Sequence, residues 1–117
     1  MKTIFIVDDS DTNLAMAEEA LEDFFSTMTL PSAAKMFSLL EKIKPDLILL
    51  DIEMPEMNGF EALERLKAGS HADIPVIFLT GTVDAYIEKR SSELGAIGII
   101  TKPFSQSILL QRINSHI

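Results

Sequence analysis

The chain has 117 residues, enough for one domain with a buried core and too few for two. Its composition, 47% hydrophobic and 24% charged, is that of a globular protein, and no apolar run approaches the length of a membrane span. The net charge of -8 argues against non-specific binding to nucleic acids or anionic membranes, and the lack of cysteine excludes disulfides and thiolate sites. We expect a cytoplasmic protein without membrane or nucleic-acid contacts.

The N-terminal apolar run at residues 4–7 predicts a buried strand. It superficially resembles a signal peptide, but Asp8, Asp9 and Asp11 end it far too early. A helix over residues 11–25 is expected next, because apolar residues recur there at spacings of three and four. The apolar face of this helix comprises Leu14, Ala17, Leu21, Phe24 and Phe25.

A weaker apolar run near residues 27–30 predicts the second strand. Ser32 can then cap a second helix, which must end before Pro45 because a proline disfavours helical backbone in the residue before it. The apolar face of this helix is Met36, Leu39, Leu40 and Ile43. The run at residues 47–50 predicts a third strand.

The segment Asn-Gly-Phe-Glu that begins at Asn58 resembles a capping box and opens a third helix, which Gly69 ends. Its inward residues are Phe60, Leu63 and Leu66. Residues 76–79 predict a fourth strand, and Thr82 can cap a fourth helix.

The fourth helix is expected to close at Leu94 and Gly95, before a fifth strand at residues 97–100. Ser105 can cap the last helix. That helix carries Ile108, Leu109 and Ile113. Strict alternation of strands and helices with short loops predicts an α/β fold, in which helices cover both faces of a parallel sheet.

Polar residues stand where the predicted strands end, and these ends share one edge of a parallel sheet. Asp8 and Asp9 follow the first strand, Asp51 the third, Thr80 the fourth and Lys102 the fifth. Two carboxylates about 4 Å apart repel by roughly 4 kcal/mol at an effective dielectric near 20, so such a cluster needs cations or a retained proton. Lys102 supplies one charge, and a hard divalent cation such as Mg²⁺ fits the remainder.

This set of residues suits phosphoryl chemistry. A carboxylate beside Mg²⁺ can attack phosphorus and form an aspartyl-phosphate. The metal and a lysine then offset the phosphoryl charge, while a hydroxyl donates to a phosphoryl oxygen. Asp51, Lys102 and Thr80 match these roles.

At these positions the sequence resembles the receiver domain of bacterial response regulators, and the resemblance covers the whole chain, residues 1–117. It is specific because Asp51 is followed by Met-Pro-Glu-Met-Asn-Gly and, about fifty residues on, by Lys-Pro. The matching segments are residues 6–10, 45–60, 75–81 and 101–104. The resemblance implies a flavodoxin-like (βα)5 three-layer sandwich with a parallel five-stranded sheet in the order 2-1-3-4-5.

The resemblance also implies residue roles. Asp51 becomes the phosphorylation site, Thr80 moves toward the phosphoryl group, Lys102 pairs with it, and the Lys102-Pro103 bond is cis. Gly81 leaves access to the phosphoryl group open. The implied Mg²⁺ ligands are Asp9 and Asp51 directly, the backbone carbonyl of Glu53, and Asp8 through water.

By the same resemblance, the phosphoryl donor is a sensor histidine kinase or a histidine phosphotransfer protein. The signal is a population shift on the surface of the fourth helix, fifth strand and fifth helix, through which a homodimer or an output domain can form. Two residues depart from the usual pattern. Ile99 stands where relatives usually carry an aromatic residue, so we expect switching to rely on Thr80 and loop movement. Glu53 lies where a hydrolytic water must approach the phosphoryl group.

Other functions are weaker matches. A receiver-like module that binds partners without phosphorylation does not need the full set of polar residues. A flavodoxin needs a phosphate-binding loop after the first strand, where Asp8 and Asp9 repel phosphate. A haloacid-dehalogenase-type phosphatase needs a second aspartate where Glu53 stands. We therefore expect a signalling phosphoacceptor and not an enzyme. The chain is either a complete single-domain regulator or the N-terminal receiver of a longer protein, and the apolar Ile117 and the short fifth helix slightly favour the second.

Overall fold

The computed structural model describes all 117 residues and contains five strands that alternate with five helices. No helix in it has the length and apolar character needed to cross a membrane. The elements in chain order are β1 (Thr3–Val7), α1 (Asp11–Leu21), β2 (Ser26–Leu30), α2 (Ala33–Leu40), β3 (Leu47–Asp51), α3 (Gly59–Ala68), β4 (Val76–Thr80), α4 (Ala85–Leu94), β5 (Gly98–Thr101) and α5 (Gln106–Asn114).

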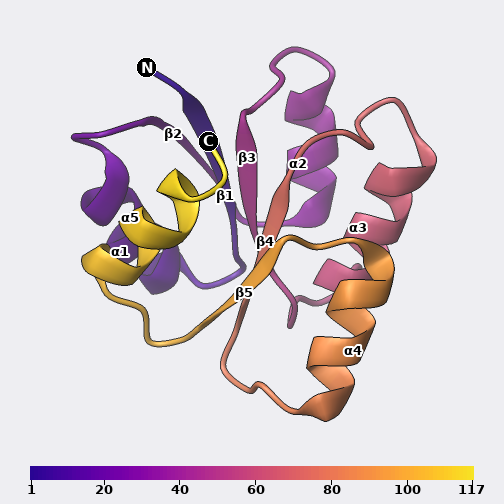
Figure 1. Ribbon diagram of the computed structural model, residues 1–117. Helices are drawn as coiled ribbons and strands as arrows, with labels where there is room; N and C mark the ends of the chain where they lie inside the picture. Colours follow the sequence, from indigo (N-terminus) through magenta and orange to yellow (C-terminus); the bar gives the residue numbers. More distant parts are fainter.

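The strands form one parallel sheet in the order β2-β1-β3-β4-β5. Helices α1 and α5 cover one face of this sheet, while α2, α3 and α4 cover the other (Figure 1). The predicted flavodoxin-like fold class and strand order are therefore confirmed. The register pairs Val7 with Leu50 and Thr80 with Thr101, which brings the carboxyl ends of the strands together at one edge of the sheet.

Two buried clusters hold the helices to the sheet, one on each face. Because successive side chains of a strand point to opposite faces, each central strand contributes to both clusters. In β3, for example, Ile48 and Leu50 pack on the side of α2 and α3, while Leu47 and Leu49 pack on the side of α1 and α5. This double burial explains why the central strands read as continuous apolar runs.

Several helix ends follow the predicted capping residues. The side chains of Ser32 and Ser105 each accept a hydrogen bond from a backbone N–H three residues later. At the start of α3, Asn58 and Glu61 form the expected capping box, each side chain accepting from the other's backbone N–H. Gly95 ends α4 with a φ of 88°, a left-handed conformation that glycine adopts without steric cost.

Two helix boundaries differ from the prediction. Helix α1 ends at Leu21 and not at Phe25, because the chain turns before β2 so that Phe25 is buried and Phe24 is exposed. Helix α4 begins at Ala85, and its cap is Asp84, whose side chain accepts from the N–H of Ile87, and not Thr82. Both candidate caps are short polar residues, so the sequence alone does not discriminate between them.

Besides Phe24, two more residues assigned to apolar helix faces are exposed. Ile43 lies beyond the end of α2 at Leu40, where the helical spacing no longer applies. Ile108 lies on α5, but Leu109 and Ile113 are the residues that face the sheet, and the position before Leu109 points away from it.

Candidate functional site

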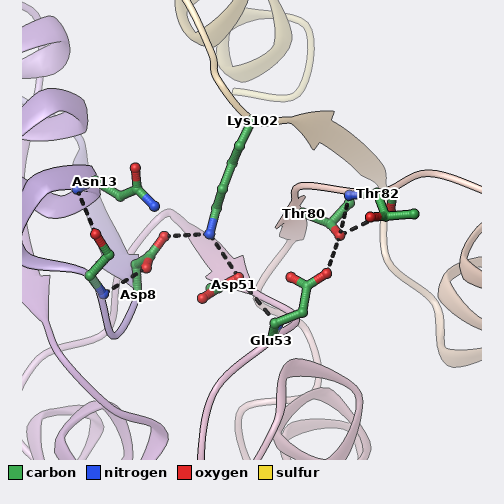
Figure 2. A network of polar contacts seen from close by, with 8 residues as sticks. Asp8, Asn13, Asp51, Glu53, Thr80, Thr82 and Lys102 are labelled. Atoms are coloured by element: carbon green, nitrogen blue, oxygen red, sulfur yellow. Dashed lines mark hydrogen bonds and ion pairs between the residues drawn. The ribbon is translucent and has the colours of Figure 1, made fainter.

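The polar residues predicted at the strand ends meet at the carboxyl edge of the sheet. Asp8 and Asp9 directly follow β1, Asp51 and Thr80 are the last residues of β3 and β4, and Lys102 directly follows β5. Asp8, Asp51 and Thr80 are buried, whereas Asp9 is exposed. Figure 2 shows the Lys102 side chain reaching down between Asp8 and Asp51, with Thr80 on the far side of Asp51.

Three carboxylates are gathered around one lysine. Oxygen atoms of Asp8, Asp9 and Asp51 lie within 4.8 Å of one another. The Nζ atom of Lys102 lies 2.9 Å from Asp51 Oδ1, to which it donates a hydrogen bond, and 2.9 Å from Asp8 Oδ2, to which it is joined as an ion pair. A single ammonium group therefore offsets two buried negative charges.

The electrostatics of the site appear in two pKa shifts. Burial raises the pKa of Asp51 from 3.8 to about 7, the hydrogen bond from Lys102 opposes this rise, and the charge of Asp8 adds to it. Burial acts to lower the pKa of Lys102, but Asp8 and Asp51 outweigh it and raise the pKa above 10.5. Lys102 therefore stays charged at neutral pH, while Asp51 is poised between its two protonation states.

Backbone N–H groups fix the orientation of the two buried carboxylates. The N–H of Ser10 donates to Asp8 Oδ1 at 2.9 Å, and the N–H of Glu53 donates to Asp51 Oδ1 at 3.2 Å. Ser10 is also the cap of α1, since its hydroxyl accepts from the N–H of Asn13. The loop after β1 thus holds Asp8 and starts α1 through the same residue.

The structure reveals a contact that the sequence does not predict. The hydroxyl of Thr80 lies 2.6 Å from Glu53 Oε1, 3.0 Å from the carbonyl oxygen of Thr82 and 3.2 Å from the nitrogen of Thr82. The side chain of Glu53 therefore points at Thr80 and away from Asp51, although its backbone N–H binds Asp51 (Figure 2). In the sequence, the only indication of this contact with Thr80 is the acidic residue two positions after Asp51.

A close backbone approach sets the loop between β3 and α3. A Cβ atom on Gly59 would lie 2.5 Å from the carbonyl oxygen of Asp51 and 2.8 Å from the Cα of Ile52, so no side chain fits there. The N–H of Gly59 donates to the carbonyl oxygen of Ile52 at 2.9 Å. By contrast, a Cβ atom on Gly81, after β4, would meet no atom within 4 Å. The first glycine is required by packing and the second is not.

Ile99 is half-buried in β5, opposite Phe78 in β4, and packs against the cluster on the α4 side of the sheet. An aliphatic side chain there fills space beside the core but has no ring to turn between an inward and an outward position. Ile99, which was expected to depart from the aromatic residue of the family pattern, is thus an apolar packing residue in the structure.

The donor set at the carboxyl edge suits a hard cation. The three clustered side chains offer only carboxylate oxygens, the ligands that Mg²⁺ and Ca²⁺ prefer. Asp8 Oδ2 is buried, and its charged neighbour is the ammonium of Lys102 at 2.9 Å, which Asp8 shares with Asp51. The residues present therefore fit a divalent metal ion.

Similarity to known proteins identifies the family. The model of the response regulator receiver domain matches residues 4–114. The chain belongs to this family. Receiver domains are signalling phosphoacceptors and not enzymes, and this chain, with the acidic pocket at its carboxyl edge, is a phosphoacceptor receiver domain.

Individual relatives agree with the family. A probable cyclic di-GMP phosphodiesterase of Vibrio cholerae is 39% identical over 116 residues, which are 98% of this chain and 26% of that protein. The polar-differentiation response regulator DivK of Brucella ovis is 30% identical over 118 residues, 99% of this chain and 96% of DivK. The chain thus spans about a quarter of the first relative and nearly all of the second.

The fold is also found in a solved receiver structure. The chemotaxis protein CheY4 of Vibrio cholerae, crystallised at low pH, superposes with a TM-score of 0.95 at 26% identity. The superposition covers 100% of this chain and 99% of that one.

Proposed function

We propose that Asp51 is the residue of this receiver domain that accepts the phosphoryl group. The observation that carries this assignment is its place in the sheet, since β3 lies between β1 and β4. Asp51 therefore has the carboxylate of Asp8 on one side, the hydroxyl of Thr80 on the other, and the ammonium of Lys102 2.9 Å from its own oxygen. Asp8 shares the lysine but follows β1, which is not adjacent to β4 and Thr80, and Asp9 forms no ion pair with Lys102.

In the proposed step, a carboxylate oxygen of Asp51 forms the bond to phosphorus. The bond between phosphorus and the imidazole nitrogen of the donor breaks, and its electron pair stays on that nitrogen. Lys102 offsets the charge of the phosphoryl oxygens, and the hydroxyl of Thr80 donates a hydrogen bond to one of them. Burial of Asp51 keeps competing water away from the reacting carboxylate.

The metal of the site is proposed to be Mg²⁺, held by Asp8, Asp9, Asp51 and the backbone carbonyl of Glu53. When bound, Mg²⁺ supplies positive charge that offsets the phosphoryl oxygens and the crowded carboxylates. Support comes from the all-oxygen donor set and from the single lysine, which leaves the buried carboxylates under-neutralised.

The donor is proposed to be a sensor histidine kinase or a histidine phosphotransfer protein in the cytoplasm, with residues 1–117 acting as one receiver domain. The partner-binding surface is proposed on α4, β5 and α5, for a second copy or an output domain. Exposed apolar side chains support this choice: Tyr86 on α4, Ile97 before β5 and Ile108 on α5 are 66%, 37% and 40% exposed.

Intact-mass spectrometry after incubation with acetyl phosphate and Mg²⁺ tests the phosphoacceptor. We expect a mass increase of one phosphoryl group on the wild-type chain and none on Asp51→Asn. An adduct of equal yield on both proteins would show that another residue is the acceptor. No adduct on either would favour the alternative that the domain binds its partners without being phosphorylated.

A further inference from the structure

The hydroxyl of Thr80 has one proton and more than one possible acceptor. The N–H of Thr82 donates to this hydroxyl, so the hydroxyl proton is left for either the carboxylate of Glu53 at 2.6 Å or the carbonyl oxygen of Thr82 at 3.0 Å. A charged acceptor forms the shorter and stronger hydrogen bond. The proton of Thr80 is therefore committed to Glu53 in the unphosphorylated domain.

Glu53 contacts both Asp51, the proposed phosphorylation site, and Thr80, whose hydroxyl has to change its hydrogen-bond acceptor on phosphorylation. Its backbone N–H binds Asp51 Oδ1 at 3.2 Å, while its side chain binds Thr80. A phosphoryl oxygen on Asp51 needs the same hydroxyl proton that Glu53 accepts, and it also brings negative charge toward the Glu53 carboxylate. The two states are mutually exclusive, since one proton cannot serve both acceptors.

On the basis of the phosphorylation of Asp51 proposed above, we propose that Glu53 is a positioning residue that holds Thr80 in the unphosphorylated arrangement. Its carboxylate must release the Thr80 hydroxyl before that hydroxyl can reach the phosphoryl group. Glu53 thereby sets how far the phosphorylated domain shifts toward the switched state. Removing the carboxylate favours that state, because the competing acceptor is gone.

The Thr80 contact can be tested first in the protein without metal or phosphoryl group, by NMR of the Thr80 methyl group and the Thr82 amide. We expect Glu53→Ala to shift both signals, because Thr80 loses its acceptor and Thr82 binds the same hydroxyl. The control is Glu56→Gln, which removes a charge from the same exposed loop. Unchanged Thr80 and Thr82 signals in Glu53→Ala would overturn the proposal.

The second measurement is the affinity for beryllofluoride, a mimic of the phosphoryl group, with Mg²⁺ present. We expect Glu53→Ala to bind it about tenfold more tightly than wild type. Tenfold corresponds to the lower end of the free energies typical of a hydrogen bond to a charged group, because Glu53 is exposed. Glu53→Gln keeps a neutral acceptor, so a gain of about threefold is expected. Glu56→Gln measures the effect of removing a charge elsewhere on the same loop, without the contact to Thr80.

A double-mutant cycle with Thr80→Val separates the hydrogen bond from charge repulsion. Without the hydroxyl only the relief of charge repulsion remains, so Glu53→Ala should gain less affinity in the Thr80→Val background than it gains with Thr80 present. An equal gain from Glu53→Ala with and without the Thr80 hydroxyl would show that Glu53 acts only through its charge and would overturn the proposal.

Intact-mass spectrometry distinguishes a failure of the role proposed for Glu53 from a failure of the phosphorylation proposed for Asp51. If the wild-type chain forms the phosphoryl adduct but Glu53→Ala binds beryllofluoride no more tightly than Glu56→Gln, only the role of Glu53 is wrong. If neither the wild-type chain nor any variant forms the adduct or binds the mimic, the phosphorylation of Asp51 fails, and with it the role of Glu53.

Discussion

Replacing Lys102 with methionine removes the only cation that contacts both buried carboxylates. Its Nζ lies 2.9 Å from an oxygen of Asp8 and 2.9 Å from an oxygen of Asp51. At an effective dielectric near 20, each contact is worth about 6 kcal/mol of attraction. The net loss is smaller, because the ammonium itself no longer has to be buried and because Asp51 can take up a proton. Breaking a buried ion pair by removing one partner costs about 3 to 5 kcal/mol.

The size of the loss depends on pH through Asp51. Its pKa in the folded state, about 7, lies above the ordinary value of 3.8, so this carboxyl reduces stability as the pH rises through that interval. At pH 5 Asp51 is mostly protonated in the wild-type fold, and Lys102 pairs with Asp8 alone. We expect Lys102→Met to lower the free energy of unfolding by about 3 kcal/mol at pH 8 and by about half as much at pH 5.

The assay is urea denaturation followed by circular dichroism, with a chelator present so that no divalent cation replaces the lost charge. Lys44→Met is the control, since Lys44 pairs with Asp73 at 2.7 Å but both side chains are more than half exposed. Its denaturation midpoint should stay close to that of wild type at both pH values. A Lys102→Met protein as stable as wild type at pH 8, or one that loses more at pH 5, would refute the electrostatic account of the site.

Three further changes test other features. Asp51→Asn should flatten the fall in stability of the metal-free protein between pH 4 and pH 7, and its free energy of unfolding at pH 8 should exceed that of wild type by about 2 kcal/mol in the same denaturation assay. An unchanged pH profile would contradict the raised pKa of Asp51. Gly59→Ala should lose about 2 to 3 kcal/mol, because its Cβ would meet backbone atoms 2.5 and 2.8 Å away, whereas Gly81→Ala should cause no overpacking. Asp84→Ala removes the cap of α4 and should lower the free energy of unfolding by about 1 kcal/mol. The same loss from Thr82→Ala, with none from Asp84→Ala, would instead support Thr82 as the cap.

The fold and the gathering of the polar residues were predictable from sequence for a physical reason. Parallel strands share the direction of their carboxyl ends, so residues such as Asp51 and Lys102, about fifty positions apart, are brought to the same edge once the strands are recognised. The capping box of Asn58 and Glu61 was equally accessible, because both of its hydrogen bonds lie within one helical turn.

What the sequence does not determine is the direction of a side chain outside regular structure. Glu53 follows a strand in an irregular loop, and whether its carboxylate points to Asp51, to Thr80 or to solvent depends on how that loop packs. The same holds for the choice between Thr82 and Asp84 as the cap of α4, which is decided by where the chain after β4 becomes helical. The outward position of Ile108 depends on which face of α5 rests on the sheet, and apolar residues on both sides of that face obscure it.

The contacts of Thr80 connect the site to the proposed partner-binding surface without an aromatic residue at position 99. The hydroxyl of Thr80 contacts both the nitrogen and the carbonyl oxygen of Thr82, two residues before Asp84, the cap of α4. If the hydroxyl leaves Glu53 for a phosphoryl oxygen, both Thr82 contacts must change, and the displacement reaches the first turn of α4 directly through the chain. A large ring that turns inward is therefore not required to carry the signal, because the loop after β4 is itself tied to the hydroxyl that moves.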